Sequence, residues 1–300
     1  MSDQTYQRFY ASEQYLLPAD QMETRRLNAQ HKMITTLFDG MLSMAPTNLT
    51  SGDRVLESAA GTGIWALEFF EKNRADGVIL AIDCIDISSA QFPANHPPQL
   101  HFSVNSVADL PNPEWSNTFT YVHERLLTFA MNDSLWRSAV SELFRVIKPG
   151  GWVELVEMNV DLSGWSVGPN STKLIAFSDA AFGAKGVIKD LSVYLPRILK
   201  EAGFVDVNCK PRGILMGEEL ELGGEATDEF RTDAGTYSFS KMWRQGYMGM
   251  KGRAVESGGF GIFTTVREYE ALVEASAREW SDSKEAYVTF HTILAQKPMP

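Results

Sequence analysis

The stretch RVLESAAGTGIW, residues 54–65, decides the fold. Val55 and Leu56 are typical of the end of a buried parallel strand, and residues 59–63 are expected to form a turn without bulky side chains. Apolar residues then recur at helical spacing from Ile64. A strand, a glycine turn and a helix in this order make the first half of a Rossmann-type unit, in which the turn lets the backbone approach a nucleotide.

The turn also indicates which cofactor it accepts. A dinucleotide-binding turn has a third glycine in the helix, which lets a pyrophosphate rest on the helix N-terminus, whereas this helix continues as Ile64-Trp65-Ala66. Glu57 precedes the turn, where an acid suits a cationic ligand better than a phosphate. We therefore expect S-adenosyl-L-methionine (SAM), which carries an ammonium and a sulfonium group. A turn that serves packing alone is the alternative.

The composition is that of an ordinary soluble globular protein, with 44% hydrophobic and 22% charged residues. Its 300 residues fit one large α/β domain with insertions, or two small domains. The net charge of −11 argues against nucleic-acid or membrane-surface binding. No apolar run approaches the ~20 residues of a membrane span. We expect neither a nucleic acid nor a membrane as partner, and the sequence leaves the oligomeric state open.

The two cysteines predict a cytoplasmic protein. Cys84 and Cys209 lie in apolar strand-like runs and are typical of reduced core residues. The chain has no CxxC pair and no His-x-x-x-His spacing, so we expect no metal site. The opening MSDQTYQRFY is polar and lacks the apolar core of a secretion signal.

Strand-like runs alternate with helix-like segments after residue 52, which indicates a doubly wound sheet. The sequence predicts an α/β fold: a Rossmann-like, seven-stranded, mostly parallel sheet with helices on both faces, an N-terminal helical extension and a helical lid insertion. The pattern lapses at residues 159–188 and 211–263. The expected strands are one that ends at 56 and those at 78–88, 100–104, 119–122, 152–157, 205–209 and 286–294. The expected helices are 20–38, one from 64, 134–147, 191–202 and 265–280.

We divide the chain into four segments. Residues 1–50 form an N-terminal arm and helical cap, and residues 51–210 form the SAM-binding core. Residues 211–263 form a helical lid that shapes the substrate site, and residues 264–300 add the last helix and strand of the sheet. Ligands of open α/β sheets bind at the carboxyl ends of the strands, so insertions there cover or shape a pocket.

The first strand and its turn supply the expected contacts to the methionine part of the cofactor. We expect Glu57 to receive the ammonium group. Ala59, Gly61 and Gly63 belong to the turn, whose glycines allow close approach of the backbone.

The second strand needs a carboxylate at its end to accept both ribose hydroxyls. Asp83 and Asp86 compete for this role. The segment Asp86-Ile87-Ser88 ends the strand, so we favour Asp86, with Ile87 beside it. Asp83 becomes the ligand if the strand is shorter.

The turns after the third and fourth strands complete the expected cofactor site. Ser106 is expected to bond adenine N6 and the Val107 N–H to bond N1, with Asp109 as the alternative acceptor. His123 follows the fourth strand, where the methyl group must point. It is a candidate general base and cofactor contact, and a surface or supporting role is its alternative.

The N-terminal helix and the lid supply the expected acceptor contacts. Gln30 and His31 share the inward face of the first helix, and His31 is a second candidate base. The segment 230–263 is rich in aromatic residues and methionine, which suit an apolar ligand wall or the core of an ordinary subdomain. The expected substrate contacts are Gln30, Tyr237, Met242, Trp243 and Tyr247.

The motifs GTGIWA, DIS, HERLLT and KPGGWVELVE resemble class I SAM-dependent methyltransferases. The N-terminal segment RLNAQH and the terminal TILAQKP resemble the fungal LaeA-like group within them. That group has Asp-Val-Gly-Thr-Gly-Thr-Gly at its turn, so this chain replaces its Asp by Glu57 and its first Gly-Thr by Ala59-Ala60. Ser106 stands where the group has an acidic residue.

The resemblance implies methyl transfer from SAM, with S-adenosyl-L-homocysteine (SAH) as product. Small natural-product intermediates are the commonest acceptors of such enzymes, and some members regulate secondary metabolism. We expect O-methylation of a small apolar or aromatic molecule, ahead of N- or C-methylation. The alternatives are a SAM-binding regulator without turnover and a SAM-fold isomerase or cyclase.

Overall fold

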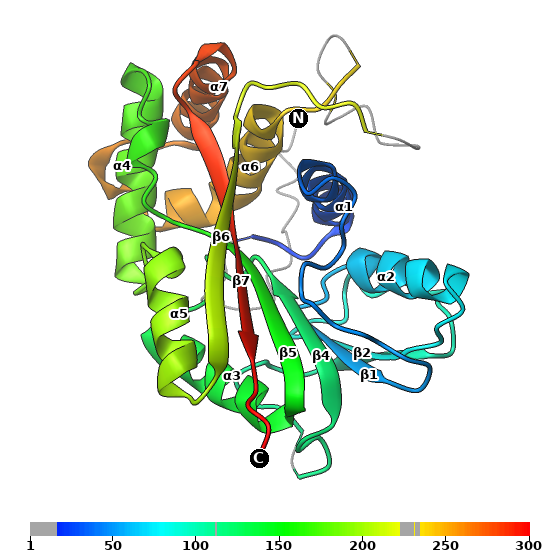
Figure 1. Ribbon diagram of the computed structural model, residues 1–300. Helices are drawn as coiled ribbons and strands as arrows, with labels where there is room; N and C mark the ends of the chain where they lie inside the picture. The colour runs from blue at the N-terminus through cyan, green and yellow to red at the C-terminus, as the bar shows by residue number, and fades with distance from the viewer. Residues whose placement is uncertain (1–16, 112, 223–230, 232–234) are drawn as a thin grey trace.

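One seven-stranded sheet forms the centre of the protein in the computed structural model, which describes residues 17–111, 113–222, 231 and 235–300. The strands are β1 (Arg54–Ser58), β2 (Ala81–Asp86), β3 (Leu100–Val104), β4 (Phe119–Arg125), β5 (Ile147–Met158), β6 (Val205–Leu215) and β7 (Tyr287–Gln296). Their order across the sheet is β3-β2-β1-β4-β5-β7-β6. Figure 1 shows β4, β5, β7 and β6 side by side in this sheet. Strands β1 to β5 are parallel to one another, whereas β7 runs antiparallel to β5 and β6. The predicted mostly parallel α/β sheet is confirmed.

Helices cover both faces of the sheet. α2 (Ile64–Ala75) packs on one face, where Trp65 and Phe70 share a core with Val55 and Ile82. α3 (Asp133–Val146) and α5 (Leu191–Glu201) share a second core with the opposite face. Because helices pack on both faces, the sheet is doubly wound, as predicted.

A third core lies beyond the sheet. It joins α1 (Gln21–Leu37), α4 (Pro169–Ala184), α6 (Phe239–Glu256) and α7 (Val266–Asp282) to the last residues of β5 and to parts of β6 and β7. Figure 1 shows α1, α6 and α7 gathered at the same end of the molecule. The described residues also include two short 3₁₀ helices, η1 (Ser163–Trp165) and η3 (Gly258–Gly261).

The helices that were predicted from sequence include α1 and α7, whose N-caps are formed by residues next to the helix in the chain. Asp20 caps α1, since its Oδ1 accepts the Glu23 N–H at 3.0 Å, and Thr265 and Glu268 form the predicted capping box of α7.

Helix α4 lies in the segment 159–188, where the sequence shows no pattern. Gly168 occupies its N-cap position and has no side chain to accept a hydrogen bond. Glu279 of α7 caps the helix instead, because its carboxylate accepts the N–H groups of Asn170 at 3.0 Å and Ser171 at 2.7 Å. The local signals are weak: Pro169 opens the helix and the Ser171 hydroxyl accepts the Gly168 N–H at 2.9 Å. The cap from Glu279, more than a hundred residues away, leaves no trace in the local sequence.

Strand β2 begins later than predicted. The expected run starts at Val78, but the Val78 N–H donates to the Asn73 carbonyl at 2.9 Å and so closes the end of α2. The strand starts at Ala81.

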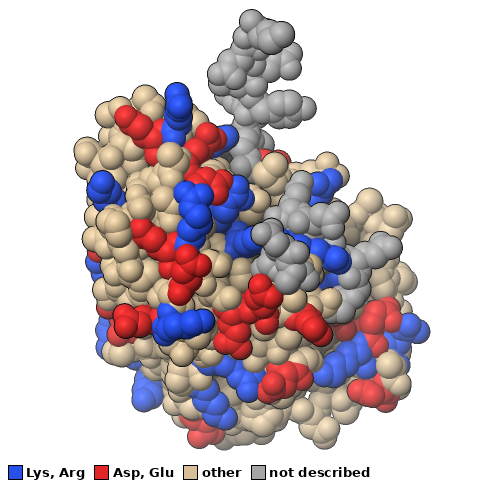
Figure 2. All heavy atoms as spheres, turned by 90° about the horizontal axis from the view of Figure 1, so that it is seen from above, with Lys and Arg blue, Asp and Glu red and all other residues tan. Residues whose placement is uncertain are grey.

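Basic and acidic side chains are interspersed on the surface seen in Figure 2. Among the residues that the structure describes, no helix is both long and apolar enough to cross a membrane. The same residues contain no group of three or more His, Cys, Asp or Glu side chains placed to hold a metal ion.

Candidate active site

The turn between β1 and α2 has a left-handed backbone at three positions, with φ of +65° at Ala59, +53° at Gly61 and +72° at Gly63. Gly61 lines the cavity above the turn, but Gly63 does not. A Cβ at residue 63 would lie 2.6 Å from the Phe102 ring. The geometry supports close approach of the cofactor at Gly61, as predicted. At position 63 a glycine is needed for another reason, because the positive φ and the nearby Phe102 ring both disfavour a Cβ.

The cavity has a volume of about 490 Å³, which lies within the usual range of small-molecule sites. Its wall is formed by the carboxyl ends of β1, β2 and β4, the turns that follow β1, β2, β3 and β4, and the helices α1, α4 and α6. The residues predicted to bind the cofactor that line it are Glu57, Ala59, Gly61, Asp86, Ile87, Ser106 and Val107.

Asp86 faces the cavity in a fixed orientation. Its carboxylate accepts the backbone N–H groups of Gly61 at 2.9 Å and Ser88 at 3.1 Å. Burial raises the pKa of Asp86, and these backbone donors oppose the rise. The competing Asp83 is paired with Arg54 at 2.7 Å and does not line the cavity. The geometry therefore favours Asp86 as the ribose ligand.

Glu57 is a buried carboxylate that contacts His123 of β4. Its Oε2 lies 2.6 Å from His123 Nδ1, and the imidazole stacks on Trp65 with ring centroids 3.8 Å apart. Burial raises the pKa of Glu57 and the nearby Arg125 lowers it, while burial also lowers the pKa of His123. Burial is the larger of the two effects on Glu57, so its pKa lies well above the ordinary value. The contact with His123 Nδ1 fixes the orientation of the Glu57 side chain.

His123 itself does not line the cavity. Its ring is covered by Trp65 and only 1% of the residue is exposed. The predicted direct contact with the cofactor and the predicted role as a base are therefore not supported by the geometry. His123 instead positions Glu57.

His31, the other candidate base, has both ring nitrogens occupied. Arg125 Nη2 donates to Nδ1 at 2.8 Å, and Nε2 donates to Glu68 at 2.9 Å. The side chain is fully buried, lies outside the cavity lining, and has a pKa lowered first by burial. An imidazole bonded in this way has no free nitrogen for an acceptor proton, so His31 links α1, α2 and β4 rather than acting as a base.

The turn after β3 borders the cavity through the two residues that the sequence favours. Ser106 and Val107 line it, and the alternative Asp109 does not. The turn is held internally, because Asp109 N–H donates to the Ser106 carbonyl at 3.0 Å and Ala108 N–H to the Ser106 hydroxyl at 3.2 Å.

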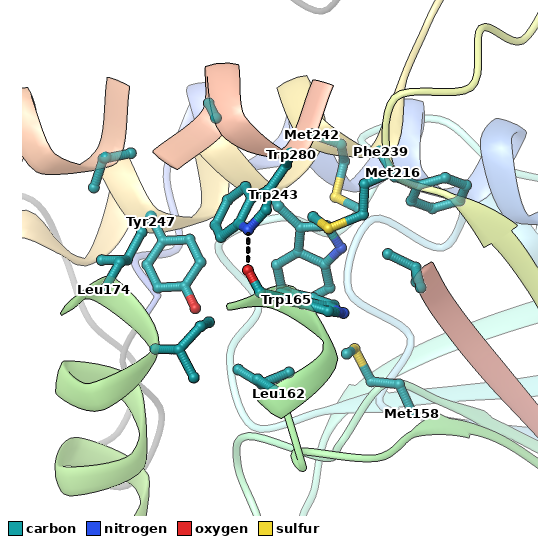
Figure 3. Close-up of a cluster of buried hydrophobic side chains, with 14 of the residues drawn as sticks. Met158, Leu162, Trp165, Leu174, Met216, Phe239, Met242, Trp243, Tyr247 and Trp280 are labelled. Atoms are coloured by element: carbon teal, nitrogen blue, oxygen red, sulfur yellow. Dashed lines mark hydrogen bonds between the residues drawn. The ribbon is translucent and has the colours of Figure 1, made fainter. Parts of the chain in front are cut away.

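The opposite end of the cavity is largely apolar. The predicted substrate contacts Gln30, Trp243 and Tyr247 line it, beside Phe182 of α4 and Met250 of α6. Figure 3 shows the side chains of Trp243 and Tyr247 within a cluster of aromatic and methionine side chains around Trp165. Such a wall suits an apolar or aromatic ligand.

Two predicted substrate contacts lie behind this wall. Tyr237 and Met242 are each 1% exposed, and neither lines the cavity. The sulfur of Met242 accepts N–H groups of Arg26 at 3.5 Å and Gln30 at 3.7 Å, so Met242 packs α6 against α1. The geometry does not support either of these two predicted contacts. Tyr237 precedes α6 and pairs with Leu220 in a β-bridge, and Met242 lies on the side of α6 that faces α1. Phe230 of the expected lid lies outside the described residues.

A buried carboxylate shapes the wall between the two ends. Leu126, Leu127 and Phe129 line the cavity, and Leu126 has the unfavourable φ of +62°. Glu157 of β5 accepts the N–H groups of Leu127 at 2.7 Å and Thr128 at 3.0 Å, together with the Thr128 hydroxyl proton. These hydrogen bonds stabilise the strained turn. Burial raises the pKa of the Glu157 carboxyl to about 7.

Sequence reasoning missed Arg26, Arg125 and Phe182, which also line the cavity. Arg125 ends β4 two residues after His123, so its position at a strand's carboxyl end was an available signal. Phe182 belongs to the unpredicted α4, and Arg26 resembles an exposed helix residue in sequence.

Comparison with known proteins agrees with the class expected from the sequence, a SAM-dependent methyltransferase. Residues 29–208 match the family model described as a methyltransferase domain. The N-methyltransferase tcpN of Claviceps purpurea is 31% identical over 213 residues, which are 69% of this chain and 74% of that protein. The secondary metabolism regulator LAE1 of Gibberella fujikuroi is 30% identical over 159 residues, 51% of this chain and 48% of that protein. This chain spans about half the length of several other curated relatives that it matches.

A solved geranyl diphosphate methyltransferase, in complex with GPP and sinefungin, has the same fold at a TM-score of 0.51 and 14% identity, over 93% of this chain and 84% of that chain. The two cavity carboxylates and the glycine turn suit the ammonium and ribose of SAM, and the resemblance to LaeA-like methyltransferases is confirmed. The chain therefore belongs to the methyltransferase domain family, and it is a SAM-dependent methyltransferase.

Proposed function

We propose that the protein transfers the methyl group of SAM to a nitrogen atom of a small, largely apolar or aromatic natural-product intermediate. One observation carries the proposal: a single cavity of about 490 Å³ joins the carboxylate-bearing strand ends to an aromatic wall built by α4 and α6. In this proposal the donor and a small acceptor share one cavity.

The proposed cofactor site lies at the strand ends. Glu57 holds the ammonium group, Asp86 the ribose hydroxyls, and Ser106 and Val107 the adenine. The sulfonium of SAM supplies an already activated methyl group, so the protein must mainly orient the acceptor and exclude water. Phe182 and the aromatic residues of α6 do this in the proposal.

Two observations favour nitrogen as the acceptor atom. The relative tcpN is named an N-methyltransferase. In the described part of the chain, no histidine lines the cavity. A neutral amine attacks with a free lone pair, whereas a hydroxyl group must lose its proton to a base. O-methylation, the expectation from sequence, remains a prediction that the same experiment tests.

A regulatory protein is the second candidate, because relatives such as LAE1 are named secondary metabolism regulators. Such a protein binds SAM and acts through a protein partner, or methylates one. With methyl-labelled SAM, such a protein would transfer the label to a protein or would transfer none.

The test is incubation of the purified protein with methyl-labelled SAM and a fungal culture extract, followed by separation of small molecules from protein. We expect label in a low-molecular-weight product, with NMR placing the new methyl group on nitrogen. An Asp86→Ala variant is the matched control and gives no labelled product. Label on oxygen contradicts the proposed acceptor atom, and label in protein contradicts the proposed acceptor class.

A further inference from the structure

Arg125 places a guanidinium group in the wall of the cavity, and most of its N–H groups are available to a ligand. It ends β4, and it lines the cavity together with Glu57. Within the described residues, its guanidinium makes one hydrogen bond, from Nη2 to His31 Nδ1 at 2.8 Å. The planar fork of a guanidinium suits a carboxylate, which accepts two parallel N–H groups.

The charges around Arg125 restrict what it can bind. Burial lowers the pKa of Arg125, and four carboxylates oppose this effect and favour the cationic form: Glu57, Glu68, Glu154 and Glu157. Three of these four carboxylates lie outside the cavity lining. Glu57 and Arg125 therefore present one negative and one positive group to the same space. That pair matches a ligand that carries an ammonium and a carboxylate on the same carbon atom, as an α-amino acid does.

We propose that Arg125 binds the carboxylate of the methionine part of SAM while Glu57 binds its ammonium group. The inference rests on the cofactor position proposed above. His31 acts as a positioning residue, because its Nδ1 accepts from one arm of the guanidinium and leaves the other donors for the ligand.

A purely structural role is the rival explanation. Arg125 also compensates the buried Glu57 and ties β4 to α1 through His31. Loss of that support weakens every ligand of the cavity alike. Loss of a carboxylate contact weakens only ligands that carry the carboxylate.

The experiment is isothermal titration of SAM, SAH and decarboxylated SAM, which keeps the ammonium and sulfonium but lacks the carboxylate. Arg125→Met should weaken SAM and SAH by roughly tenfold to a hundredfold, the worth of a charge-assisted hydrogen bond. The affinity for decarboxylated SAM should change by no more than about twofold, because this ligand has no carboxylate contact to lose.

Two further variants keep the test decisive if Arg125→Met does not fold. Arg125→Lys retains the charge without the fork and should lose affinity for SAM and SAH in the same direction, though less. Arg26→Lys is the matched control, since Arg26 also lines the cavity but its guanidinium is held by Glu23 at 2.6 and 2.9 Å. It should leave the ratio of SAM to decarboxylated SAM affinity unchanged.

Equal losses for all three ligands in the Arg125 variants, or no loss for SAM, would overturn the inference. Glu57→Gln separates this failure from failure of the cofactor position. All three ligands carry the ammonium, so Glu57→Gln should weaken all of them. If it weakens none, the proposed cofactor position is itself wrong.

Discussion

Ala59 and Ala60 form a matched pair in which one substitution has opposite effects. Ala59 has φ of +65°, a left-handed conformation that costs a residue with a Cβ about 1–2 kcal/mol. Glycine removes that cost but loses about 0.5–1 kcal/mol more chain entropy on folding. Ala59→Gly should therefore raise the free energy of unfolding by about 0.5–1 kcal/mol.

Ala60 does not have a positive φ, and its side chain is buried in the core beneath α2. Ala60→Gly loses a buried methyl group, worth about 0.8 kcal/mol, as well as the same chain entropy. It should lower the free energy of unfolding by about 1–2 kcal/mol. The two variants differ by one position and should change stability in opposite directions.

Urea unfolding without SAM, followed by circular dichroism, measures both effects as shifts in midpoint at constant slope. An Ala59→Gly variant that is no more stable than the wild type would refute the strain argument. The result also bears on family history, because the LaeA-like pattern has glycine where this chain has Ala59.

Gly63→Ala should destabilise the protein by more than Gly77→Ala, as measured by urea unfolding. Both positions have positive φ, which costs about 1–2 kcal/mol, but only at Gly63 would the new Cβ meet a ring, that of Phe102 at 2.6 Å; equal losses would show that the ring contact is unimportant. Burial raises the pKa of Glu157 from its ordinary 4.5 to about 7, so its stabilising contribution is complete below pH 4.5 and is lost as pH rises through 7. The stability of the wild type relative to Glu157→Gln should fall by up to about 3 kcal/mol across that window, and a difference independent of pH would contradict the assignment.

The sheet was predictable because its signals are local. Apolar strands such as β3 and capped helices such as α7 carry their pattern within their own residues. The position of Asp86 and Glu57 at the cavity was predictable for a related reason, since ligands of such sheets gather at strand ends.

Other features depend on contacts between distant segments. Glu279 caps α4 from another helix, and Trp65 covers His123 from α2. Sequence position alone placed His123 near the methyl group, but its neighbours turn it toward Glu57. The same limit applies to Met242, whose place behind the wall depends on how α6 packs on α1.

A crystal structure of the protein with SAH tests the central claim most directly, because the claim concerns where the cofactor lies. The account predicts SAH in the cavity above the turn, with its ribose hydroxyls on Asp86, its ammonium on Glu57 and its carboxylate on Arg125. Electron density for SAH outside this cavity, or a ribose held by Asp83, would contradict it.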